Sequence, residues 1–487
     1  MTPKEVYEQL ITTRKSYEDT AKDLSELTIP YLFLDEGSSS TTKMIDNYAS
    51  RYSAIAINTL ASQMSLTLLP PSGSSFRFDP DSKAMEEFTQ GDANARAGIM
   101  ALLGTQMARV NKEIENQEIR PQFNEILQAM IAVSAVVVEK VKGEGIKWHS
   151  LRNFAVKLDS KGEPLVIIVK ETLHKEDLPD GIELDEDKDT AELYTMCVLG
   201  DGMWTVTQSL DSEMVGKESK YKKDMLPYVY LGWTRQRGDT YHRPYAEQYK
   251  GILEDYSNIN KILIEGGLIA SKSLIMVNPL GTTRKKDVAD SKNGDVIDGR
   301  ADEVTAFQLG KNYDFQIPMQ LRAELTQQID RAFLSRQGTQ RQAERVTAEE
   351  VRLNAQELEK NLTGIYSTMS KKFNKWLVKH IMKELGIKFD TIDVNVITGL
   401  DALGRNMESV KMDNYMMRIA NLGLNRWLKE DEILTRYASY EGIDTVNLIK
   451  TPQEVQQEAQ QAQEQALQQQ MLSSGADTLG KNAVPQV

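Results

Sequence analysis

The sequence predicts an α+β fold, with a mostly antiparallel β module inserted between helical segments. Apolar residues recur at helical spacing before about residue 130 and again after Pro244. Between them lie short β-branched or alternating stretches, separated by acidic and glycine-bearing turns. The content of 40% hydrophobic and 26% charged residues is typical of a globular protein. A chain of 487 residues exceeds the size of one core, so two to four subdomains are expected.

Composition and charge disfavour several classes of protein. The single cysteine, Cys197, excludes an intrachain disulfide framework and a cysteine-rich zinc site, and we expect a buried, inert thiol. The first residues do not resemble a signal peptide and no stretch has transmembrane length, so we expect no membrane partner. Together with the single cysteine, this predicts a cytoplasmic protein, or at least one made in a reducing compartment. A net charge of −13 argues against a broad nucleic-acid-binding face, although it permits a wall that DNA passes without adhering.

The N-terminal part is predicted to be mainly helical. One helix is expected over 3–27 and a longer one over 46–70, where Pro70 and Pro71 end it. A short strand follows at 74–80, and apolar residues at helical spacing predict another helix within 84–117. These elements precede the β module.

A second helical part begins at Pro244, which suits the first turn of a helix over 245–271. Three short strands are then expected in SLIMVNP, GDVIDG and VTAFQLG, around the basic loop GTTRKKDVADSKNG. The segment IPMQLRAELTQQIDRAFLSR predicts a further helix, starting next to a proline. This helix leads into LSRQGTQRQAERVTAEEV, a small basic loop in an acidic protein.

The basic loop is followed by a well-specified helix start. Thr347 and Glu350 have the spacing of a capping box, and the helix they begin is expected to run to Gly386. At about 40 residues it would be about 60 Å long. Further helices are expected at 408–422 and 427–438, before a glutamine-rich stretch with good helix propensity but little core-forming surface.

No motif predicts catalysis or a cofactor. The stretch GADTLGKN lacks the serine or threonine of a phosphate-binding loop and the strand and helix that should flank it. The acidic run DLPDGIELDEDKD lacks the glycine of a calcium loop, and no pair of the four histidines has helical metal-ligand spacing. We therefore expect a protein that is not an enzyme, with no catalytic residue, no cofactor and no metal site.

Several segments, in order, resemble one family. These are TIPYLF, NTLASQMSLTLLP, RPYAEQYKGILEDYSNINK, LIASKSLIMVNPLG, QRQAERVTAEEVRLNAQELEKNLTGIYSTMS and ITGLDALGR. They resemble the portal proteins, or head-to-tail connectors, of short-tailed bacteriophages, from about residue 5 to about residue 450. The resemblance implies a portal fold with long helices and small β modules, assembled as a homododecameric ring around a DNA channel at one capsid vertex.

The resemblance also implies an organisation into named regions. These are the wing at 1–243, the first stem helix at 244–271, the clip at 272–317, the second stem helix at 318–335, the tunnel loop at 336–346, the long wing helix and its return at 347–400, the crown at 401–471 and a disordered tail at 472–487. The basic loop thereby becomes the part that projects into the channel.

Two groups of residues are candidate contact sites on this basis. The tunnel loop would face DNA with Arg336, Gln337, Thr339, Gln340, Arg341 and Arg345, and the clip would contact DNA or a partner with Arg284, Lys285 and Lys286. The implied partners are double-stranded viral DNA, the terminase large subunit, tail adaptor or nozzle proteins, major capsid and scaffolding proteins, and internal core proteins. The implied location is the virion, with assembly in the host cytoplasm.

A second hypothesis belongs to a different class. The chain could be a structural DNA-binding protein that forms no ring and uses its basic loops for affinity. Tight, salt-sensitive DNA binding by a small species would favour that hypothesis, and a large ring with poor affinity for free DNA would favour the portal. That the chain is an enzyme is the third and least favoured hypothesis.

Overall fold

The computed structural model describes residues 2–34, 50–71, 75–80, 89, 93–175, 189–211, 213–270, 273–292, 295–308, 315–335, 356, 358, 360–362, 364–387, 394–398, 412–413, 415–419, 421–422 and 433. The chain forms two compact units. The first consists of Met1–Leu66 with Glu118–Glu344, and the second of Thr67–Gln117 with Arg345–Val487. No helix in the described ranges is long and apolar enough to cross a membrane.

The chain begins with two helices rather than the single one expected. α1 spans Pro3–Ile11 and starts with a capping box between Thr2 and Glu5, and α2 spans Lys15–Leu27. The break places Arg14 in the interior, where its guanidinium donates to the Tyr7 hydroxyl and to the Phe154 carbonyl oxygen, both at 2.9 Å. The single helix expected over 3–27 is wrong for this reason, because helical periodicity does not reveal that Arg14 is buried between two helices.

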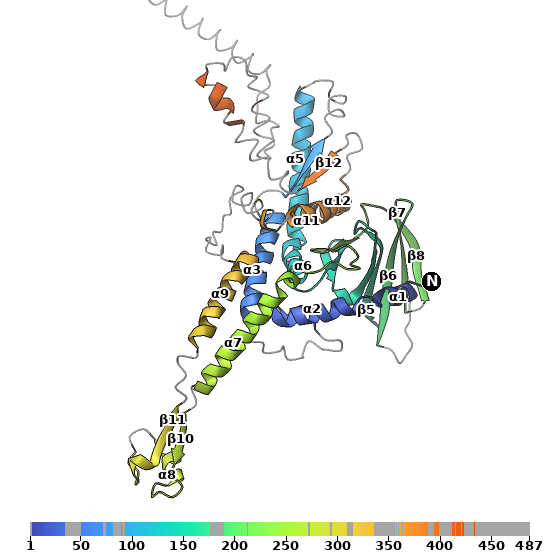
Figure 1. Ribbon diagram of the computed structural model, residues 1–487. Coiled ribbons are helices and arrows are strands. Elements are labelled where there is room, and N and C mark those ends of the chain that lie inside the picture. Colours follow the sequence, from blue (N-terminus) through green and yellow to red (C-terminus); the bar gives the residue numbers. More distant parts are fainter. Residues whose placement is uncertain are drawn as a thin grey trace, which may run out of the picture. The chain divides into compact units, whose positions relative to one another are not determined.

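The predicted β module is confirmed and consists of two antiparallel sheets (Figure 1). It follows α6 (Ile119–Ala132), a largely buried helix. The smaller sheet has the strand order β3-β2-β9 and the larger sheet the order β4-β5-β6-β7-β8, so its strands are consecutive in the chain. The strands of the two sheets are β2 (Val136–Val141), β3 (Gly145–His149), β9 (Tyr228–Leu231), β4 (Phe154–Leu158), β5 (Pro164–His174), β6 (Thr190–Gly200), β7 (Met203–Leu210) and β8 (Glu213–Lys222). Cys197 is buried in β6, and burial raises the pKa of its thiol, which fits the inert thiol expected.

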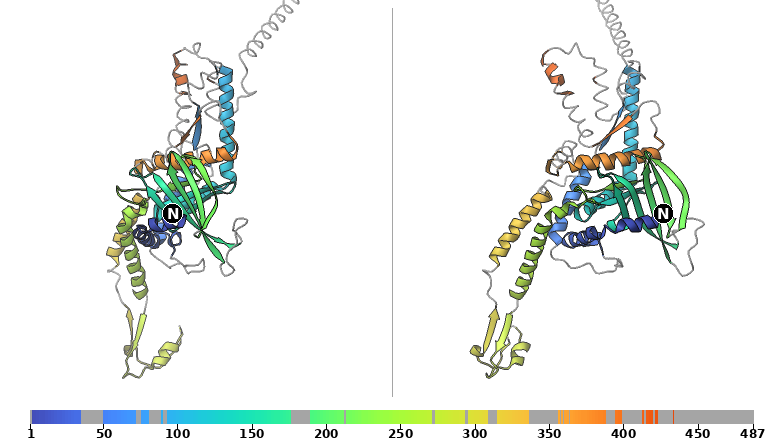
Figure 2. Two further views of the ribbon diagram at one scale, coloured as in Figure 1. Left: turned by 90° about the vertical axis from the view of Figure 1, so that its right-hand side faces the viewer. Right: turned by 45° about the vertical axis from the view of Figure 1, so that its right-hand side comes forward.

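Two antiparallel helices follow the β module. After Pro244, a 3₁₀ turn (Tyr245–Tyr249) leads into α7 (Lys250–Ala270), which lies beside α9 (Gln316–Ala332) in Figures 1 and 2. Both helices were predicted. The two helices run antiparallel. The Tyr245 hydroxyl, just before α7, bonds to the Ala332 carbonyl at the end of α9, and Gly266 near the end of α7 packs against Phe315 at the start of α9.

A small β module connects α7 to α9. β10 (Ser273–Val277) and β11 (Val304–Gln308) pair as an antiparallel ribbon. The expected basic loop contains the short helix α8 (Lys285–Asp290), and a 3₁₀ turn (Ala301–Glu303) precedes β11. The strand expected at GDVIDG is wrong, since residues 295–299 form no ladder and the Val296 side chain is 98% exposed, with nothing to pack against.

The second unit contains described elements from both ends of the chain. β1 (Phe76–Pro80) pairs with β12 (Val394–Thr398), and α5 spans Ala93–Asn116. The C-terminal end of α3 (Ser50–Leu68) also belongs to this unit. There, the Asn374 side chain donates to the Leu68 carbonyl oxygen at 2.9 Å and the Tyr366 hydroxyl to that of Thr67 at 3.3 Å. The strand β12 was not predicted.

The single long helix expected up to Gly386 is interrupted. Gly364 adopts φ 83°, after which α11 (Ile365–Met369), a π-helical turn (Ser370–Asn374) and α12 (Lys375–Glu384) follow. A left-handed residue cannot continue an α-helix, and glycine adopts that conformation without strain. The predicted end is confirmed, because Gly386 has φ 66° and its N–H bonds to the Lys383 carbonyl.

Other predictions concern residues outside the described part. These are the Thr347–Glu350 capping box, almost all of the acidic run at 177–189, the helix at 427–438 apart from residue 433, the glutamine-rich stretch and GADTLGKN. Residues 412–413, 415–419 and 421 are helical, as expected of 408–422.

The contact between α7 and α9 yields a first prediction. A Cβ atom at Gly266 would lie 2.4 Å from Cε1 of Phe315, whereas one at the adjacent Gly267 would meet nothing within 4 Å. Gly266→Ala should therefore destabilise the helix pair by about 1–3 kcal/mol, while Gly267→Ala should stabilise it by up to about 1 kcal/mol. Hydrogen exchange of 253–270 and 315–329 measures both. Equal protection in the two variants would contradict the close packing.

Candidate functional site

The candidate tunnel-loop residues, Arg336, Gln337, Thr339, Gln340, Arg341 and Arg345, lie outside the described residues. The structure does describe the segment that leads into them, at the C-terminal end of α9. There, Leu334 has φ 55°, a left-handed conformation that ends the helix. We call residues Asp330–Ser335 the loop root.

A buried carboxylate holds the loop root in place. Asp330, only 8% exposed, accepts hydrogen bonds from the hydroxyl of Tyr52 on α3 and, at 2.5 Å, from that of Ser335. Burial and the bond to Asp330 raise the pKa of Tyr52 to about 12. The last described residue before the basic loop is thereby bonded to the same carboxylate as α3.

An aromatic cluster fixes the loop root from the α7 side. The Phe333 ring is fully buried, with its centroid 5.5 Å from that of Tyr245 and 5.7 Å from that of Tyr249. The Tyr245 hydroxyl donates to the Ala332 carbonyl oxygen at 2.8 Å, and this bond satisfies one of the carbonyls that a helix end leaves free. These contacts hold the C-terminal end of α9 against the segment that begins α7.

The module between α7 and α9 holds the other candidate residues. Arg284, Lys285 and Lys286 are all exposed, at the start of α8. They lie within a nearly balanced charge pattern, because residues 273–308 contain five basic and six acidic side chains. The predicted basic cluster is thus a local feature of a mixed surface.

The turn that carries this cluster is held by one carboxylate. Glu303 accepts hydrogen bonds from the backbone N–H of Thr283 at 2.8 Å and from its hydroxyl at 2.7 Å. The hydroxyl and N–H of Thr283, followed by other bonds, lower the pKa of Glu303 to about 2. Glu303 therefore stays ionised at neutral pH and orders the segment just before Arg284.

Apolar side chains are exposed on these same elements. They include Ile262, Ile264 and Leu268 of α7, Ile317, Met319 and Leu321 of α9, and Ile275, Met276, Leu280 and Val296 of the β10–β11 module. Leu280 is 95% exposed. Large apolar side chains exposed together are typical of surfaces that contact another molecule. Sequence periodicity missed this surface, because both faces of α7 contain apolar residues and their partners could not be distinguished.

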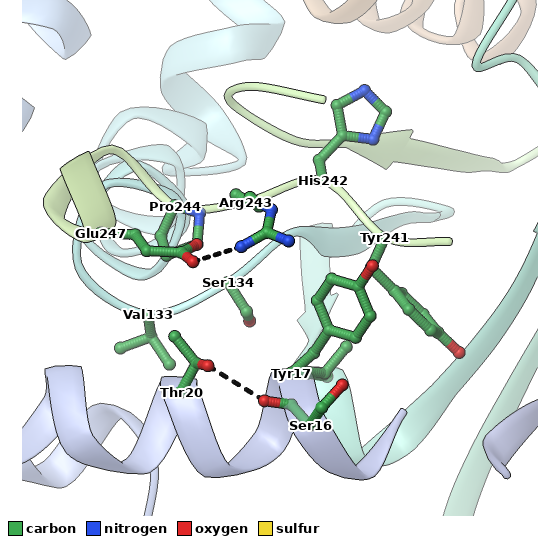
Figure 3. Close-up of a pocket in the computed structure, with 11 residues that line it drawn as sticks. Ser16, Tyr17, Thr20, Val133, Ser134, Tyr241, His242, Arg243, Pro244 and Glu247 are labelled. Atoms are coloured by element: carbon green, nitrogen blue, oxygen red, sulfur yellow. Dashed lines mark hydrogen bonds and ion pairs between the residues drawn. The ribbon is translucent and has the colours of Figure 1, made fainter. Parts of the chain in front are cut away.

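A small cavity lies where α2 meets the segment before α7 (Figure 3). At about 150 Å³ it is well below the size of a typical small-molecule pocket. Arg243 occupies its wall and bonds to Asp239 at 2.9 Å and to Glu247 at 2.5 Å, and the Arg243 bonds lower the pKa of Asp239. The Tyr17 ring of α2 lies 5.8 Å from the Arg243 guanidinium carbon. These contacts hold α2 against the segment before α7 and indicate a structural role for the residues around the cavity.

Comparison with known proteins connects these elements to one family. Residues 2–388 match the model of the bacteriophage head to tail connecting protein family. The portal protein of Enterobacteria phage T3 is 27% identical over 481 residues, which cover 93% of this chain and 89% of that protein. The portal protein of Escherichia phage T7 is 27% identical over 489 residues, with the same coverage, and that of Pseudomonas phage phiKMV is 25% identical over 469 residues, with 91% of each chain covered.

Among solved structures, a chain from the neck of an empty gene transfer agent particle matches with a TM-score of 0.36 and 11% identity, over 82% of this chain and 94% of that one. The family match covers well over half of the sequence and includes the paired helices, the module between them and the loop root. The chain belongs to the bacteriophage head to tail connecting protein family.

Proposed function

We propose that the chain is a viral portal protein, which forms a ring-shaped channel through which double-stranded DNA enters and leaves the capsid. Membership of the connector family supports this function, as do relatives named portal protein that align along most of the chain. The observation that carries the proposal is the exposed apolar surface on α7, α9 and the β10–β11 module, which a single chain leaves uncovered.

This surface suits contacts between identical chains in a closed ring. A head-to-tail interface that repeats around an axis closes into a ring when the rotation allows it. We propose a homododecamer in which α7 and α9 form the stem, the β10–β11 module forms the clip, and 1–243 with 347–400 form the wing around them. The crown would come from 401–471, with a tail at 472–487.

The charge pattern supports passage of DNA without tight binding. Twelve chains of formal charge −13 would carry about −156, which repels the phosphate backbone. Against this background, Arg336, Arg341 and Arg345 of each tunnel loop would contact phosphates weakly and without sequence preference. Gln337, Thr339 and Gln340 would add uncharged contacts, and the loop root would hold each loop at the same level of the channel.

The clip is the proposed docking site for other packaging and tail proteins. Its mixed charges, with Arg284, Lys285 and Lys286 exposed, suit protein partners with acidic patches, which we propose to be the terminase large subunit and then a tail adaptor. ATP hydrolysis would belong to the terminase. The portal itself would act as a conduit and platform in the virion, in contact with capsid, scaffolding and core proteins.

Electron microscopy of the purified protein tests the ring directly. We expect end-on views with about twelve subunits around an open channel, together with poor affinity for free DNA at physiological salt. Uniform monomers or dimers that bind DNA tightly, with affinity that falls steeply as salt increases, would overturn the portal and favour the non-ring DNA-binding alternative.

Charge reversal in the tunnel loop tests the channel contact. Arg341→Glu should leave ring assembly intact but lower the yield of DNA-filled heads about tenfold, because each ring loses twelve phosphate contacts and gains twelve repulsive charges. Arg109→Glu is the matched control, since Arg109 is exposed on α5. A normal yield of filled heads from Arg341→Glu would refute the assigned role.

A further inference from the structure

Three metal-ligating side chains meet between the two sheets of the β module. Glu139 comes from β2, His149 from β3 and Glu171 from β5, and one ligand atom of each lies within 4.8 Å of the other two. His149 is only 3% exposed. Sequence spacing could not reveal this cluster, because hydrogen-bonded strands and two facing sheets bring the residues together.

The geometry of the cluster fits a bound divalent ion. Nε2 of His149 lies 3.2 Å from Oε2 of Glu139. Two ligand atoms bound to zinc at about 2.0–2.2 Å and at a tetrahedral angle would lie about 3.3–3.6 Å apart. One ion could therefore bind both atoms with little movement of either strand, and Glu171 would supply a third ligand from the facing sheet.

Glu139 is also oriented as a metal ligand should be. The Tyr228 hydroxyl of β9 donates to its second oxygen, Oε1, at 2.9 Å and orients the carboxylate. Its other oxygen, Oε2, faces Nε2 of His149, so the two oxygens of this carboxylate are held by different partners.

The charges of the cluster leave room for one more cation. Lys147 pairs with Glu171, so that two carboxylates face one ammonium and an imidazole that is neutral when it acts as a ligand. The Lys147 side chain is 56% exposed and can move into solvent, which would free Glu171 and open a route for an ion. An ion-pair network without a metal is the alternative, and experiment separates the two.

We propose that Glu139, His149 and Glu171 form a divalent-metal site that links the two sheets, with a preference for zinc. One imidazole nitrogen and two carboxylate oxygens suit zinc and manganese better than magnesium or calcium, which take all-oxygen sites. The ion would replace the hydrogen bond between His149 and Glu139. Three protein ligands leave a fourth position for water.

Zinc titration of the full-length protein, stripped with a chelator, tests the site. We expect one Zn²⁺ bound per chain in competition with a fluorescent zinc chelator. His149→Gln and Glu171→Gln should each weaken binding at least about tenfold. Glu192→Gln is the matched control and should bind zinc as the wild type does. Glu192 likewise accepts a tyrosine hydroxyl, from Tyr194 at 2.5 Å, and pairs with Lys170 at 2.6 Å, but its described contacts include no histidine.

Lys147→Met distinguishes a metal site from a buried ion-pair network. Removal of the competing ammonium should tighten zinc binding several-fold, and the melting temperature, lowered in chelator, should recover when zinc is added. An ion-pair network without a metal predicts the same loss of stability with and without zinc. The proposal is overturned if the wild type takes up no stoichiometric zinc, or if Lys147→Met fails to respond to it. It is equally overturned if folded His149→Gln and Glu171→Gln bind as the wild type does.

Discussion

Phe333→Ala should release the loop root and lower hydrogen-exchange protection of residues 325–333 by about a hundredfold or more. The Phe333 ring is fully buried against Tyr245 and Tyr249, and truncation of such a ring costs about 3–5 kcal/mol, with each 1.4 kcal/mol equal to a tenfold change in the opening equilibrium. The effect should be local, because the described ring contacts of Phe333 are with Tyr245 and Tyr249, which lie outside the β sheets. Exchange measured by mass spectrometry across the chain checks both parts.

The same substitution tests whether the loop root positions the tunnel loop. Without the Phe333 ring, the end of α9 is held less tightly, and the bond from Tyr245 to the Ala332 carbonyl should weaken with it. The loop root would then no longer be fixed. We expect rings that assemble but retain DNA poorly, as with Arg341→Glu. Tyr31→Ala, at a side chain that is 49% exposed, should change neither property. Unchanged protection of 325–333 in Phe333→Ala would refute the anchoring role.

The parts of the fold that the sequence predicts well are those governed by local rules. Pro244 immediately precedes the 3₁₀ turn before α7, Gly386 follows the end of α12, and alternating segments form the antiparallel β module. Each depends on backbone chemistry or on a repeating pattern within a short window. Such signals can therefore be recognised in the sequence without knowledge of distant contacts.

Errors occur where distant contacts override a local pattern. A helix over 3–27 is reasonable from periodicity, yet Arg14 turns inward to reach the carbonyl of Phe154, and the helix breaks there. The strand β12 forms only because β1, more than 300 residues earlier, pairs with it. Neither partner can be identified from one sequence without an alignment.

The residues of the candidate site also fall into two groups, those that the sequence predicts and those that only the structure reveals. The arginines and glutamines at 336–345 are visible in the sequence, and the family resemblance implies a DNA contact for them. By contrast, the groups that would hold that loop in position, Asp330, Tyr52 and Tyr245, resemble ordinary residues on helical faces. Their roles follow only from three-dimensional contacts, as does the meeting of Glu139, His149 and Glu171.

Arg14→Met should destabilise the first unit by about 3 kcal/mol or more, because it removes one partner from a buried polar network. The guanidinium bonds to Glu18 at 2.5 Å, to the Tyr7 hydroxyl and to the Phe154 carbonyl oxygen. Methionine fills a similar volume but leaves the carbonyl without that donor and Glu18 without its counter-ion. Pulsed hydrogen exchange during thermal unfolding measures the loss of stability, through the temperature at which residues 3–27 and 154–158 become exposed.

Two further variants separate charge from geometry at this position. Arg14→Lys keeps the charge, but a single ammonium lacks the fork with which Arg14 reaches Glu18 and Tyr7 together, so it should recover only part of the stability. Arg109→Met removes an exposed arginine and should change stability by less than about 0.5 kcal/mol. Full stability in Arg14→Lys would mean that charge alone suffices. Full stability in Arg14→Met would show that packing of Tyr7 against Ala155, Ile168 and Tyr194 holds α1 on the sheet without the arginine.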